Sequence, residues 1–132
     1  MIHILIATSD KDSLMDFSAG FGKNDITIAW ATGCEQVLSQ IKNNKFDLLV
    51  VDEMLSDIKG LECIEKVIFD NPFLNTAAIS SLSPKDYHEE SEGFGVLMQV
   101  PVNPDSEDGE KLLDYLNNIL KITNSDLKKR TN

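Results

Sequence analysis

The feature that most constrains the fold of this chain is a buried-strand pattern over residues 46–52, which ends in an aspartate, Asp52. Apolar side chains occupy the successive positions Leu48–Val51, so both faces of the predicted strand must be covered by other parts of the chain. Strands of this kind lie in the middle of parallel sheets, between layers of helices. In open sheets of this type, functional groups gather at the carboxyl ends of the strands, which makes Asp52 the first candidate site residue.

Strand patterns alternate with helix patterns along the chain. The predicted strands are Ile2–Ala7, Ile26–Ala31, Phe46–Asp52, Thr76–Ser80 and Val96–Val100. Apolar residues recur at helical spacing between them, and segment 83–93 is predicted as a polar, exposed helix anchored by Tyr87. Strict alternation predicts an α/β protein with a doubly wound five-stranded parallel sheet of order 2-1-3-4-5, the flavodoxin-like three-layer sandwich. We expect one domain over 1–122 and a charged tail or linker over 123–132.

The net charge of the chain limits the classes of partner that it can bind. The 132 residues carry a formal net charge of −10, and such a surface repels phosphate backbones, so we expect no binding of nucleic acid. No apolar run approaches the roughly 18 residues of a membrane helix, and no basic leader precedes the first strand, so the cytoplasm is the expected location. The two cysteines, Cys34 and Cys63, lack CxxC spacing and lie on predicted helices. They are expected to be buried, reduced thiols.

Four positions give the chain a resemblance to the response-regulator receiver domain of the chemotaxis-regulator type. Asp52 ends the third strand, Gly60 follows in the next loop, Ser80 ends the fourth strand and Pro101 follows the fifth. The resemblance covers nearly the whole chain. It implies that Asp52 stands at the phospho-acceptor position, that Ser80 is the switch hydroxyl and that a histidine kinase or another signalling protein is the partner. It also implies a cis bond between Val100 and Pro101.

Three departures from the receiver pattern bear on the chemistry. Receivers carry an acidic pair after the first strand, and here the matching residues are Thr8 and Ser9. They carry a lysine before the fifth-strand proline, where this chain has Val100, and an aromatic switch residue where it has Leu97. Phosphoryl transfer to a carboxylate brings two anions together and needs cationic charge to offset the repulsion. The resemblance therefore implies a degenerate receiver that signals through protein–protein contact and is not an enzyme.

Mg²⁺ is the cofactor that the resemblance implies, but its ligands are few. The metal candidates are the Asp52 carboxylate, the Met54 carbonyl and Asp10, the acid that lies one step beyond the expected pair. The hydroxyls of Thr8 and Ser9 are weak replacements for carboxylates. The sequence predicts weak Mg²⁺ binding at most.

Other interpretations stay open at this point. Asp52 could serve only as a cap for the following loop, and Asp57 and Lys59 in that loop are expected to be solvated. The hydroxyl-rich segment 8–13 follows the first strand as the phosphate loop of a flavin electron carrier would, although it lacks glycine. A third alternative is a stand-alone scaffold that forms a homodimer through the fourth helix, fifth strand and fifth helix, with Tyr87, Leu97 and Val102 on that face.

Overall fold

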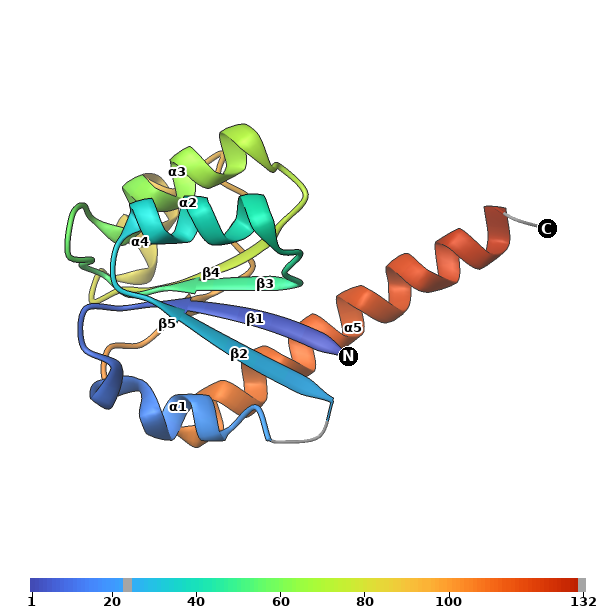
Figure 1. The fold of residues 1–132 in the computed structure, drawn as a ribbon, viewed down its shortest axis with the longest axis horizontal. Helices are drawn as coiled ribbons and strands as arrows, with labels where there is room; N and C mark the ends of the chain where they lie inside the picture. The colour runs from blue at the N-terminus through green and yellow to red at the C-terminus, as the bar shows by residue number, and fades with distance from the viewer. Residues whose placement is uncertain (23–24, 131–132) are drawn as a thin grey trace.

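A single parallel sheet forms the middle of the molecule. The computed structural model describes residues 1–22 and 25–130, with side chains described up to residue 121, and in that part the sheet has five strands in the order β2-β1-β3-β4-β5 (Figure 1). The strands are β1 (Ile2–Ala7), β2 (Ile26–Ala31), β3 (Leu48–Val51), β4 (Asn75–Ile79) and β5 (Gln99–Val100). All neighbouring strands are parallel. The predicted fold class and strand order are therefore confirmed.

Helices cover both faces of the sheet and make the three-layer sandwich. They are η1 (Lys11–Leu14, a 3₁₀ turn), α1 (Met15–Ala19), α2 (Cys34–Asn43), α3 (Gly60–Asp70), α4 (Pro84–Ser91) and α5 (Ser106–Arg130). The helices α2, α3 and α4 lie on one face, and α1 and α5 lie on the other (Figure 1). The backbone of α5 continues past residue 122, and the side chains of the predicted tail, 123–132, lie outside the described residues.

The central strand β3 supplies both apolar cores at once. Leu49 and Val51 pack under α2 and α3, whereas Leu48 and Val50 pack under α1 and α5. All four side chains are fully buried. This two-sided burial is the reason that β3 reads as a continuous apolar run, and it fixes Asp52 at the carboxyl edge of the sheet.

The ends of β3 and β4 differ from the sequence prediction by one or two residues, and two elements differ by more. The fifth strand is only Gln99–Val100, because residues 96–98 approach β4 without regular pairing. The helix predicted directly after the first strand begins as the 3₁₀ turn η1, and the Asp10 side chain forms no cap hydrogen bond there. The turn η1 lies at the carboxyl edge of the sheet, near the candidate site, whereas residues 96–98 lie toward the amino end of the fifth strand.

The prediction of reduced cysteines is wrong in this structure. Cys34 begins α2, Cys63 lies on α3, and the two form a disulfide with their Cα atoms 5.5 Å apart. The two cysteines are 29 residues apart, so the local sequence does not predict the disulfide. The pairing depends on the packing of two neighbouring helices.

The expected cis bond between Val100 and Pro101 is also wrong. No cis peptide occurs in the described residues. X–Pro bonds favour the trans form by about 0.5–1 kcal/mol, so a trans bond forms here without stabilising contacts from the surrounding residues. The helices in the described part of the chain include none that is long and apolar enough to cross a membrane.

Candidate functional site

Asp52 lies where the sequence predicts it, at the carboxyl edge of the sheet between the ends of β1 and β4. Its backbone N–H donates to the Ala7 carbonyl at 2.8 Å, which extends the pairing of β3 with β1 by one residue. The Asp52 side chain is half-buried. The sheet thus holds the backbone of Asp52 rigidly while its carboxylate remains accessible.

Both carboxylate oxygens of Asp52 accept a hydrogen bond from a neutral donor. The Thr8 hydroxyl donates to Oδ2 at 2.7 Å, and the backbone N–H of Glu53 donates to Oδ1 at 2.7 Å. Thr8 is buried, and its own oxygen accepts the backbone N–H of Asp10 at 3.0 Å. Thr8 therefore contacts Asp52 directly and stabilises its carboxylate by hydrogen bonding.

The residues around Asp52 do not fit a Mg²⁺ ion well. Asp10 and Ser9 are exposed, and Met54 has 54% of its surface exposed. Within the described residues, no three side chains of the His, Cys, Asp and Glu types come together as a metal cluster. Mg²⁺ favours carboxylate oxygens in near-octahedral geometry, and here the Asp52 carboxylate faces the hydroxyl of Thr8. This donor set favours hydrogen bonding over metal binding.

Ser80 directly follows β4, one residue beyond the end of the strand, and its hydroxyl forms a hydrogen bond within the loop that begins there. Ser80 is buried, and its Oγ accepts the backbone N–H of Leu82 at 3.1 Å. The Gln99 side-chain amide donates to the carbonyl oxygens of Ser80 and Leu82 at 3.2 and 2.8 Å. These hydrogen bonds connect the loop after β4 to β5. Val100, which follows Gln99, is fully buried.

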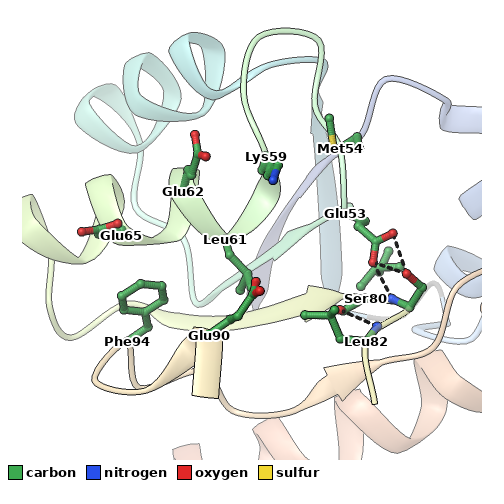
Figure 2. Close-up of a pocket in the computed structure, with 12 residues that line it drawn as sticks. Glu53, Met54, Lys59, Leu61, Glu62, Glu65, Ser80, Leu82, Glu90 and Phe94 are labelled. Carbon is green, nitrogen blue, oxygen red and sulfur yellow. Dashed lines mark hydrogen bonds between the residues drawn. The ribbon is translucent and has the colours of Figure 1, made fainter. Parts of the chain in front are cut away.

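Glu53 belongs to the site through a contact with Ser81 that the sequence did not reveal. Its carboxylate accepts hydrogen bonds from both the backbone N–H and the hydroxyl of Ser81, the latter at 2.9 Å to each carboxylate oxygen (Figure 2). These bonds join the loop after β3 to the loop after β4. The one available signal was that the acid directly follows Asp52, and spacing alone does not reveal its partner on another strand.

Asp57, in the loop after Glu53, has a role that the sequence did not predict. Its side chain is exposed, as expected, but its carboxylate also accepts the backbone N–H groups of Cys34 and Glu35 at 2.8 and 3.1 Å. It therefore caps the start of α2, where Gly33 has no side chain to do so. These backbone hydrogen bonds, first that of Cys34 and then that of Glu35, lower the pKa of Asp57 below its ordinary value. Lys59 is exposed, as expected.

Gly60 closes this loop by approaching the backbone of Asp52. Its N–H donates to the Glu53 carbonyl at 3.0 Å, and a Cβ atom at Gly60 would lie 2.0 Å from the Asp52 carbonyl oxygen. Only glycine fits such a contact with backbone. The spacing between Asp52 and Gly60 therefore has a steric cause in this fold.

A pocket opens beside these loops, between α3 and α4. It has a volume of about 550 Å³ and is bordered by the loops that follow β3 and β4 (Figure 2). Glu53, Ser80 and Ser81 belong to its lining, so the pocket adjoins the Asp52 site directly.

The face predicted for dimerisation is only partly exposed. Tyr87 anchors α4 with its side chain buried, and burial raises the pKa of its hydroxyl to about 12. Leu97 is half-buried, and Val102 has 44% of its surface exposed. Homodimerisation through this face stays a prediction.

Comparison with known proteins supports the fold. A CheY-like response regulator receiver domain protein from Methanospirillum hungatei is similar with a TM-score of 0.78 and 21% identity, over 92% of this chain and 98% of that one. The receiver domain of a Francisella response regulator gives 0.78 and 20%, over 93% and 99%. The signal receiver domain of an HD domain-containing protein from Pseudomonas fluorescens gives 0.77 and 16%, over 96% and 92%.

The sequence itself gives no such match: neither a protein-family model nor a curated protein matches it. The likeness therefore rests on three-dimensional structure, which changes more slowly than the side chains of a site. At these identities it establishes the fold, and we conclude that the chain has the flavodoxin-like fold seen in CheY-like receiver domains.

Proposed function

We propose that this chain is a receiver-type signalling module of two-component systems whose output runs through protein–protein contact, with weak or no Mg²⁺-dependent phosphorylation of Asp52. Its partner in this proposal is a histidine kinase or another signalling protein, in the cytoplasm. The fold shared with receiver domains supports the signalling class. The placement of Asp52 at the carboxyl edge of the sheet supports its correspondence to the phospho-acceptor.

The observation that carries the atypical part of the proposal is the hydrogen bond from Thr8 to Asp52. At this position a second carboxylate would help to hold the metal, and a neutral hydroxyl is a weaker ligand. Transfer of a phosphoryl group to Asp52 would then bring anion against anion with little cationic charge nearby. Val100 also replaces the cationic side chain expected from the fifth strand. The loss of one such electrostatic contact typically costs on the order of 10²–10³ in rate.

The direct test is a challenge with a small phosphodonor. The purified chain is incubated with Mg²⁺ and acetyl phosphate or beryllofluoride, and the product is read by intact mass and by amide NMR. We expect no stoichiometric modification and little change in the amide signals around Asp52. Complete, Mg²⁺-dependent modification of Asp52 would contradict the proposal.

A second test introduces the charged side chains that the receiver pattern expects at three positions. Thr8→Asp, Ser9→Asp and Val100→Lys together are expected to raise the affinity for Mg²⁺, measured by titration calorimetry. The matched control carries Thr8→Asn, Ser9→Asn and Val100→Lys, which has similar shape without the two carboxylates. Equal Mg²⁺ affinity in the two variants would mean that these positions do not face the metal site.

A further inference from the structure

The pocket between α3 and α4 combines an apolar lining with a rim of carboxylates. Its apolar part comes from five side chains: Met54, Leu61, Ile79, Leu82 and Phe94. The acidic part comes from Glu53, Glu62, Glu65 and Glu90, and Lys59 is the one cationic side chain in the described lining. A site of this composition suits a ligand that is apolar in its centre and positively charged at its edge.

The carboxylates on the rim are free to meet such a ligand. Glu62 and Glu65 lie three residues apart on α3, so both project from the same side of that helix, and Glu90 extends from α4 (Figure 2). All three side chains are exposed. Within the described part of the chain, none of the three has an ion-pair or hydrogen-bond partner. Glu53 differs, because Ser81 occupies its carboxylate.

We propose that this pocket is a docking site for a basic, amphipathic polypeptide segment of a partner protein. An apolar side chain of the segment would lie on Leu61 and Phe94, and its lysine or arginine side chains would reach Glu62, Glu65 and Glu90. The net charge of −10 attracts such a segment from a distance, and the local carboxylates determine where it binds. The inference rests on the proposed function only in naming a partner class for its protein–protein contact.

The test uses a synthetic 14-residue peptide of leucine and lysine at amphipathic helical spacing. Binding to the full chain is measured by calorimetry, and the site is located by amide NMR. We expect shifts concentrated at the residues that line the pocket. The Glu62→Gln, Glu65→Gln, Glu90→Gln variant should bind about tenfold more weakly at low salt, since three exposed ion pairs are lost.

Matched controls separate docking from general charge attraction. The variant Glu35→Gln, Glu107→Gln, Glu110→Gln removes the same charge from exposed glutamates that do not line the pocket, and its affinity should change by less than about twofold. A leucine-free lysine peptide should bind more weakly than the amphipathic one, and a leucine–glutamate peptide should not bind.

Three results would overturn the proposal: equal weakening in both glutamine variants, equal binding of the leucine-free peptide, or shifts outside the pocket. Failure of this test leaves the phosphodonor result unaffected, because the two measurements read different events. A failed phosphodonor prediction likewise leaves peptide binding to be judged by itself.

Discussion

At the scale of single residues, the site is defined by what each polar atom contacts. Asp52 lies at the carboxyl edge of the sheet, and its carboxylate oxygens accept hydrogen bonds from the Thr8 hydroxyl and the Glu53 backbone N–H. Gly60 shows the same dependence on immediate surroundings, because its lack of a side chain allows the loop to close over the Asp52 carbonyl. The identities of these neighbours, more than the presence of the aspartate, determine the chemistry.

Gly60→Ala tests this close approach. The added methyl group would lie 2.0 Å from the Asp52 carbonyl oxygen, so the loop must shift. We expect a loss of unfolding free energy of about 2 kcal/mol or more, measured by urea denaturation.

Gly95→Ala is the matched control for that substitution. Gly95 has a φ of +66° with open space around its position, so its replacement costs only the left-handed backbone strain of about 1–2 kcal/mol. A Gly60→Ala variant no less stable than Gly95→Ala would show that the loop adapts freely.

At the scale of elements, the loop after β3 organises the start of α2. Asp57 caps the N-terminus of α2 from that loop, and the disulfide between Cys34 and Cys63 joins α2 to α3 close by. Two separate connections therefore hold α2 to the segment that follows Asp52. The α2 helix has a conventional amphipathic pattern, but its cap comes from a residue that lies more than 20 positions away in the chain.

The cap predicts a specific dependence of stability on pH. Because the folded-state pKa of Asp57 is lowered, its contribution is present above the unfolded pKa near 3.8 and is lost as pH falls through the folded value. Asp57→Asn should therefore lower the midpoint of thermal unfolding at pH 7, and the difference from the parent chain should shrink below about pH 4. Circular dichroism at a series of pH values measures this.

Asp114→Asn is the control for the cap, since Asp114 is an exposed acid on α5 whose carboxylate has no hydrogen-bond partner among the described residues. Its unfolding midpoint should follow that of the parent chain at each pH. A constant difference between the Asp57→Asn variant and the parent down to pH 3 would contradict the assignment of Asp57 as a charged cap.

At the scale of the whole molecule, the sequence predicted what depends on repeating patterns. The two-sided burial of β3 and the alternation of strands and helices predicted the sheet order. The ends of the predicted strands placed Asp52 and Ser80 at the carboxyl edge of the sheet, and the roles of the two residues there stay predictions. The partners of Glu53, Asp57 and Cys34 were not predictable, since each partner lies on another element and is selected by tertiary packing. The short fifth strand was missed because residues 96–98 have a strand-like composition without regular pairing.

The excess of negative charge is also a property of the whole chain. A net charge of −10 repels itself in the folded state, and salt screens that repulsion. Raising NaCl from 50 to 500 mM at pH 7 should raise the unfolding midpoint by a few degrees, since about 1 kcal/mol corresponds to roughly 3–6 °C at this size. Near the isoelectric point of about 4.5 the same addition should have little effect, and an equal rise at both pH values would exclude self-repulsion as the cause.

The contact between Glu53 and Ser81 connects Asp52 to the pocket through a chain of hydrogen bonds. Asp52 holds the Glu53 amide, Glu53 holds Ser81, and Ser81 borders the pocket. A ligand in the pocket that favours one arrangement of these hydrogen bonds would change the affinity of Asp52 for its own ligand. By thermodynamic reciprocity, a ligand at Asp52 would change the affinity of the pocket by the same factor. Binding in the pocket and binding at Asp52 would then be coupled to the same degree in both directions.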